Sequence, residues 1–120
     1  MTIRPHDGPD RLPPIPAAQW TEAQRVEAEA MLAGPRRAIL PPFVPLLRSP
    51  DLVGHVQRVG AYLRWRSAIG PRLTELAILV TSKHYEQPVE WAIHVPLAQA
   101  EGIAAETVAA IERGERPASM

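Results

Sequence analysis

Cysteine is absent from the chain of 120 residues, and this absence excludes several kinds of chemistry. Without thiols there is no disulfide, no thiolate ligand for a metal ion, and no dithiol or thiol-nucleophile mechanism. An excess of charge of one sign is also lacking, because 13 basic residues balance 13 acidic ones. A chain without net charge shows no electrostatic footprint for nucleic acid, so no nucleic-acid partner is expected.

Long apolar runs are missing as well. No segment approaches the length of a transmembrane helix, and the first ten residues lack the apolar run of a signal peptide. We therefore expect a soluble, cytoplasmic protein without a membrane partner. Two motifs are also absent, the glycine-rich phosphate loop and the Gly-x-Ser-x-Gly nucleophile elbow. Lys83 is the single lysine, and a cation at a helix end is a simpler role for it than a Schiff base.

Proline marks the organisation of the chain. Residues 1–20 hold five prolines and little periodic apolar pattern, which predicts an extended arm anchored by Leu12, Ile15 and Trp20. We expect a single helical domain over residues 21–114 and a tail over 115–120.

Three segments of the first half have distinct signals. Thr21 and Gln24 resemble a capping box that opens a helix to about residue 32, ended by Gly34, with Val26, Ala30 and Met31 on its buried side. Residues 36–48 are apolar but broken by prolines, which predicts a short helical turn over the core or a pocket wall. Residues 49–67 predict a helix with close helix packing at Gly60 and a core stripe of Leu52, Val56, Val59 and Leu63.

Pro71 and Pro88 stand where two further helices would begin, because the first turn of a helix leaves its N–H groups unpaired. The predicted ranges are 72–84 and 88–101. The first of these is apolar nearly all round, which is typical of a buried helix. Gly102 is a natural stop, and residues 103–111 predict a last helix with Ile103, Val108 and Ile111 facing inward. The fold class is all-α, a compact bundle of about five helices with a proline-rich arm.

His94 is the candidate for chemistry. Helical spacing puts Val89 and Ile93 on the core face of residues 88–101, and His94 at its border, one turn after Glu90. A neighbouring carboxylate favours the charged ring and burial favours the neutral one, so the two together suit proton transfer. Two other interpretations stay open. His94 can be salt-linked to Glu90 without touching a substrate, or the two can bind a metal ion with His84 or Glu75 as a further ligand.

The order Glu75, Gln87, Glu90, His94, with eleven, two and three residues between, resembles the motif of the carboxymuconolactone decarboxylase and alkyl hydroperoxidase D superfamily. The similarity extends from about Arg11 to Pro117 and matches a subgroup without cysteine. It implies the helical bundle of the alkyl hydroperoxidase D type. In the peroxidase branch two cysteines stand where this chain has Gln87 and Glu90, so thiol peroxidase activity is excluded.

The decarboxylase branch implies cofactor-free acid–base chemistry on a small carboxylated lactone or a related acid, a lyase reaction without a metal. On this resemblance the catalytic candidates are His94, Glu75 and Glu90. Arg64, Arg66 or Arg72 is expected to anchor the substrate carboxylate. The candidates for substrate contact are Trp91, Arg72, Tyr85 and His84.

Similar chains of this subgroup continue with further helices where the present chain, after Gly114-Glu-Arg-Pro117, is nearly at its end. The resemblance therefore implies either a shortened homo-oligomer or a second chain that supplies C-terminal helices. The alternative to an enzyme is an oligomeric helical scaffold, or a ligand-binding member, that lost the redox cysteines.

Overall fold

The computed structural model describes residues 8–118, and within this range all regular structure is helical. Six α-helices and one short 3-10 helix follow one another along the described part of the chain, which confirms the all-α prediction. The contacts divide the chain after Leu63, so residues 8–63 and residues 64–118 are described here as two separate units. The single domain expected over residues 21–114 stays a prediction.

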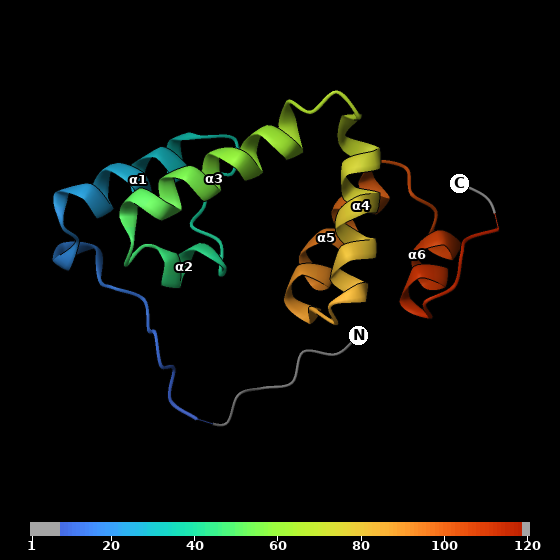
Figure 1. Cartoon of the computed structure of the whole chain (residues 1–120), viewed down its shortest axis with the longest axis horizontal. Helices are drawn as coiled ribbons and strands as arrows, with labels where there is room; N and C mark the ends of the chain where they lie inside the picture. Colours follow the sequence, from blue (N-terminus) through green and yellow to red (C-terminus); the bar gives the residue numbers. More distant parts are fainter. Residues whose placement is uncertain (1–7, 119–120) are drawn as a thin grey trace. The chain divides into compact units, whose positions relative to one another are not determined.

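The N-terminal arm of the first unit is ordered near residue 20 by a short helix and a side-chain hydrogen bond. Residues Ala17–Gln19 form the 3-10 helix η1, and the indole N–H of Trp20 donates to the carbonyl oxygen of Ile15 at 2.9 Å. Helix α1 (Glu22–Ala33) follows (Figure 1). Its capping box is present, because the side chains of Thr21 and Gln24 each accept a hydrogen bond from the other's backbone N–H. The predicted start of this helix is therefore confirmed.

Helices α2 (Phe43–Leu46) and α3 (Pro50–Trp65) complete the first unit, although the last two residues of α3 belong to the second unit. The proline-broken segment thus folds as the short helical turn that its sequence predicts. One core cluster joins the three helices, and its buried members are Ala28, Met31, Phe43, Leu47 and Val53.

The buried faces of α1 and α3 differ from those predicted. Met31 is buried as expected, but Val26 is 53% exposed and Ala30 is exposed. Helix α3 buries Val53, Gly54 and Gln57, whereas the predicted core stripe of Leu52, Val56, Val59 and Leu63 is exposed. The physical reason lies in side-chain size, since Gly54 lets Glu27 of α1 lie directly against the backbone of α3. Gly60 is approached by the Arg36 side chain rather than by a helix.

The second unit contains α4 (Gly70–His84), α5 (Pro88–Ala100) and α6 (Ala105–Glu112). Helix α4 packs on both α5 and α6 (Figure 1). Pro71 and Pro88 lie in the first turns of α4 and α5, as predicted. Gly102 has a φ of +81° and ends α5 in the left-handed conformation that glycine adopts without strain.

Ile103, Val108 and Ile111 are all buried, as their spacing predicts, and form a cluster with Leu79, Trp91 and Ala98. Two predictions for this unit are wrong. Helix α4 is not buried all round, because Leu73 and Val80 are about half exposed. Helix α5 buries Trp91, His94 and Ala98, so His94 lies on the buried face itself, whereas Val89 and Ile93, expected on the core face, are only partly buried.

None of the helices within residues 8–118 is long and apolar enough to cross a membrane.

Candidate functional site

The site lies between α4 and α5, and local structure fixes both helices. Helix α4 begins at Gly70, whose carbonyl oxygen also accepts a hydrogen bond from the Thr74 hydroxyl at 2.9 Å. Glu75 follows in the second turn and is buried. The connection to α5 is three residues long, and its Glu86 has a φ of +48°, a conformation that few residues other than glycine adopt. The Gln87 side chain then caps α5 by accepting from the backbone N–H of Val89 at 3.2 Å.

His94 and Glu75 form the centre of the site. The imidazole Nδ1 lies 2.6 Å from Glu75 Oε2, and each residue is only 5% exposed. An ionised carboxylate only accepts hydrogen bonds, so Nδ1 is the nitrogen that donates to Glu75 when that carboxylate is ionised. The carboxylate thereby orients the ring and fixes which nitrogen faces the other way.

The other ring nitrogen faces Glu90. Nε2 of His94 lies 3.4 Å from Glu90 Oε2, one turn earlier on the same helix. The Glu90 side chain is 34% exposed, whereas that of His94 is 7% exposed. The imidazole is therefore held between a buried carboxylate and one that reaches solvent.

Arg64, at the end of α3, is the second group at the buried carboxylate of Glu75. Its Nη2 lies 3.7 Å from Glu75 Oε1, which is within ion-pair distance but too long for a hydrogen bond. Its Nε atom is buried and has no hydrogen-bond partner within residues 8–118. The guanidinium also lies over the Trp65 ring, 4.6 Å from the ring centroid. The Nε–H group of Arg64 can therefore donate a hydrogen bond to a further oxygen atom.

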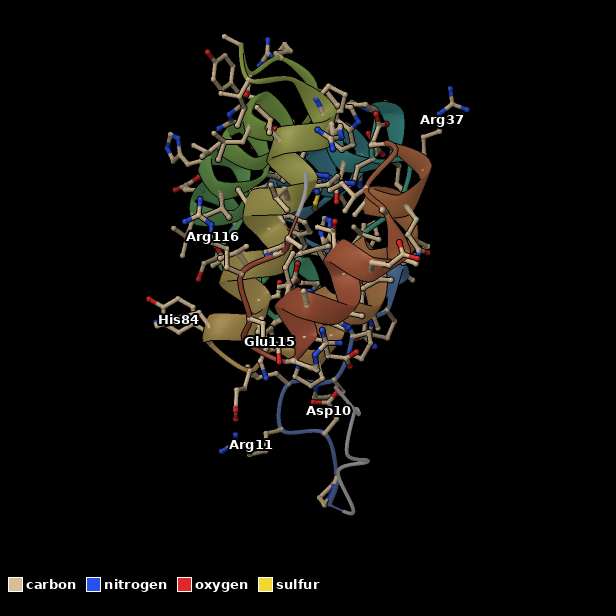
Figure 2. All side chains as sticks on the ribbon, turned by 90° about the vertical axis from the view of Figure 1, so that its right-hand side faces the viewer. Asp10, Arg11, Arg37, His84, Glu115 and Arg116 are labelled. Carbon is tan, nitrogen blue, oxygen red and sulfur yellow. The ribbon has the colours of Figure 1, made fainter. Side chains whose placement is uncertain are left out.

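The structure brings together the three catalytic candidates, Glu75, Glu90 and His94. Of the four candidates for substrate contact, Trp91 lies three residues before His94 on the same buried face of α5. Trp91 is 6% exposed and packs in the core cluster, and Tyr85 is 74% exposed. His84 lies exposed at the end of α4 (Figure 2), and its ring makes a T-shaped contact with that of Tyr85. No hydrogen bond or ion pair within residues 8–118 links Arg72 or His84 to Glu75 or His94.

Among the three arginines that sequence reasoning offers as a carboxylate anchor, Arg64 is the one that lies at Glu75. Nothing in the spacing singled it out, because it precedes the motif and lies on a different helix. For a metal, no group of three or more His, Cys, Asp or Glu side chains arranged to hold an ion is present between residues 8 and 118.

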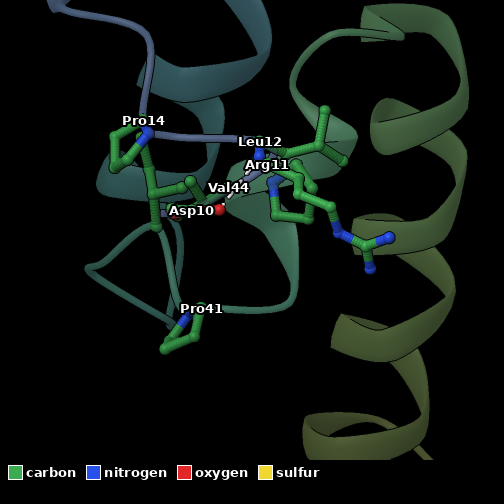
Figure 3. A pocket seen from close by; sticks show the side chains of 8 residues that line it. Asp10, Arg11, Leu12, Pro14, Pro41 and Val44 are labelled. Atoms are coloured by element: carbon green, nitrogen blue, oxygen red, sulfur yellow. Dashed lines mark hydrogen bonds between the residues drawn. The ribbon is translucent and has the colours of Figure 1, made fainter. Parts of the chain in front are cut away.

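A separate depression of about 560 Å³ lies in the first unit (Figure 3). The arm provides Asp10, Arg11 and Leu12, and the segment before and within α2 provides Ile39, Pro41 and Val44. The proline-broken segment thus also lines a pocket, the second role open to it from its sequence. The Asp10 carboxylate already accepts one hydrogen bond, from the backbone N–H of Leu12 at 2.9 Å.

Comparison with known proteins gives no match to a family model, to a curated protein or to a solved structure.

Proposed function

We propose that the chain is a cofactor-free acid–base enzyme of the carboxymuconolactone decarboxylase type. Its substrate class is a small carboxylated lactone or a related acid. The observation that supports the proposal most is the buried hydrogen bond of 2.6 Å between His94 and Glu75. A histidine so held presents its second nitrogen in a fixed direction, as a general acid requires.

In the proposed reaction, the bond between a ring carbon of the substrate and its carboxylate breaks. Carbon dioxide leaves, and the electron pair passes into the lactone carbonyl as an enolate. His94 in its charged form then gives the Nε2 proton to carbon and becomes neutral. Throughout this step the Nδ1 proton stays on the hydrogen bond to Glu75, whose negative charge stabilises the charged ring.

Glu90 is proposed to return the proton. It lies 3.4 Å from Nε2, and its side chain is one-third exposed, so it connects the buried nitrogen with solvent. The substrate must enter beside Glu90, since the opposite side of the ring is occupied by Glu75.

Arg64 is the proposed anchor for the substrate carboxylate. Its buried Nε lacks a hydrogen-bond partner among the described residues, and a guanidinium binds a carboxylate through two parallel N–H groups. Glu75 also lies at ion-pair distance from it, so one arginine would position both carboxylates.

A binding protein without turnover is the second candidate. It is favoured by the contacts of Glu75 with both Arg64 and His94, because a buried network of this kind also stabilises a scaffold. Trp91 lies in the core, which leaves fewer aromatic groups to hold a substrate near His94.

The proposal is tested by incubating the protein with a panel of small carboxylated lactones and measuring the carbon dioxide that is released. Replacing His94 by Gln removes the acid but keeps most of the side-chain volume, and we expect turnover to fall by about a hundredfold or more. Circular dichroism checks that the variant is folded.

Glu101→Gln is the matched control, because this exposed carboxylate ends the same helix away from the site. It should retain turnover within about twofold. Equal turnover in His94→Gln and in the unaltered chain would contradict the proposal. Saturable binding of a lactone acid without any carbon dioxide release would instead support the binding protein.

A further inference from the structure

Helix α3 carries apolar side chains on a face that the first unit itself does not cover. Leu52, Val56, Val59 and Leu63 are 50%, 39%, 59% and 52% exposed. We call these four residues the α3 stripe. They all belong to the first unit, whose own core is formed by other residues.

The positions of the α3 stripe follow the spacing of a helix–helix seam. Steps of four, three and four residues keep the four side chains within roughly 60° of one another at about 100° per residue. On the same count, the buried face of Val53, Gly54 and Gln57 is centred roughly 140° away. Helix α3 therefore has two separate contact faces, and only one of them is buried within the unit.

The α3 stripe is also symmetric about its own midpoint. Read in either direction it gives leucine, valine, valine, leucine with the same spacing. A surface with this symmetry is complementary to a second copy of itself turned by 180°, which is the requirement for a twofold, isologous interface. We propose that the α3 stripe binds the α3 stripe of a second copy of this chain, with the two helices antiparallel.

In this arrangement Leu52 contacts Leu63 of the other copy, and Val56 contacts Val59. The stripe contains no charge, so no like charges meet at its centre. At the ends, Asp51 in the first turn of one α3 comes to the end where the exposed Arg66 directly follows the other α3. Opposite charges and opposite ends of the helix dipole then lie beside each other, which favours the antiparallel direction over the parallel one.

The interface concerns a different surface from the His94 site and does not depend on the proposed catalysis. A seam of four residues is small, so the dimer should dissociate on dilution through the micromolar range.

Sedimentation equilibrium of the full chain tests the proposal. The average mass should rise with concentration from the 13.2 kDa of one chain toward twice that value. Val59→Glu places a charge in the centre of the seam and should weaken the dimer at least about tenfold. The matched control is Val26→Glu, because Val26 is similarly exposed, at 53%, on α1. The control should leave the dimer unchanged.

A double variant tests the direction of the two helices. It combines Val56→Glu with Val59→Lys. Antiparallel pairing puts the new carboxylate of each copy against the new ammonium group of the other, whereas parallel pairing opposes like charges. Restoration of the dimer relative to Val59→Glu supports the proposal, and failure to restore it overturns the antiparallel seam. A chain that stays monomeric at every concentration, or a Val59→Glu variant that dimerises as well as Val26→Glu, overturns the interface itself.

Discussion

Glu75 and Glu27 each face a neighbouring helix, one in each unit, and the two carboxylates differ in the groups that contact them. Glu75 in the second unit has an imidazole nitrogen at 2.6 Å and a guanidinium at 3.7 Å, with a side chain that is 7% exposed. Glu27 in the first unit has Arg58 at 3.4 Å and a side chain that is 17% exposed. The Glu27 carboxylate also lies so close to Gly54 that a Cβ there would be 2.5 Å from Oε1.

The partners of the two carboxylates distinguish a pair that only packs from a pair that can transfer a proton. An arginine does not give up its proton in a protein, so the Glu27–Arg58 pair fixes a charge and nothing more. An imidazole exchanges its proton under mild conditions, so the Glu75–His94 pair can take part in a reaction. Burial of a carboxylate is therefore not enough to mark a reactive site, and the identity of its partner decides.

The largest expected effect is on stability. Glu75→Ala leaves the Nδ1–H of His94 buried without an acceptor and removes the negative charge beside Arg64, so we expect a loss of about 3 kcal/mol in the free energy of unfolding. Urea denaturation followed by circular dichroism measures it. A loss no greater than that of Glu27→Ala would remove the distinction between the two carboxylates.

Turnover provides the second test of the comparison. Glu75→Gln keeps the side-chain shape but removes the charge that stabilises the protonated ring, and we expect about a hundredfold lower turnover of a carboxylated lactone. Glu27→Gln is the matched variant and should leave turnover unchanged, because the partner of Glu27 is an arginine that keeps its proton. Similar losses in both variants would indicate a general effect on the fold.

A smaller effect is expected at the first carboxylate itself. Arg58→Ala removes a cation whose side chain is 55% exposed, so solvent screens much of its attraction for Glu27. We expect a change below about 1 kcal/mol in the free energy of unfolding. A loss as large as that of Glu75→Ala, measured in the same urea titration, would show that the two pairs are equally important for stability.

The exposed pair of Arg113 and Glu115, whose side chains are each 58% exposed, gives a reference for the other two pairs. A hydrogen bond of 2.8 Å from Arg113, together with its charge, lowers the pKa of the Glu115 carboxyl from the ordinary 4.5. A carboxyl whose pKa is lower in the folded state than in the unfolded state stabilises the fold at pH values above its ordinary pKa. This contribution is lost as the pH falls through the folded-state pKa. An NMR titration should find the lowered midpoint, and Arg113→Ala should return it toward the ordinary value. An unchanged midpoint in that variant would exclude Arg113 as the cause.

Much of the helical architecture could be predicted from single residues with local effects. Thr21 and Gln24 cap a helix, Pro71 and Pro88 begin helices, and Gly102 ends one, because each acts through its own backbone or its nearest neighbours. These signals need no knowledge of tertiary packing.

The buried faces were harder to predict, because they depend on which helices meet. The most apolar stripe of α3 is exposed, whereas Gly54 and Gln57 are buried. Hydrophobicity alone ranks leucine and valine first, but close approach of α1 needs the small residue. The burial of His94 is set in the same way by the packing of α5 on α4, which the spacing within α5 alone does not predict.

The candidate site shows the same division. The resemblance implies a pair of Glu75 and His94, whereas the helical spacing alone pairs His94 with Glu90, and the structure places both carboxylates at the imidazole. Arg64 could be named only as one of three arginines, because its approach to Glu75 depends on the path of the chain between α3 and α4. The roles of these residues in catalysis stay predictions.

The connection between α4 and α5 has a consequence for sequence variation. It is three residues long, and the imidazole follows six residues after Pro88 on a regular helix. One residue inserted between Pro88 and His94 would rotate the imidazole by about 100° around the axis of α5 and move it by about 1.5 Å along that axis. Substitutions in this segment should be tolerated far better than insertions or deletions, because its length, more than its composition, keeps Glu75 and His94 in contact.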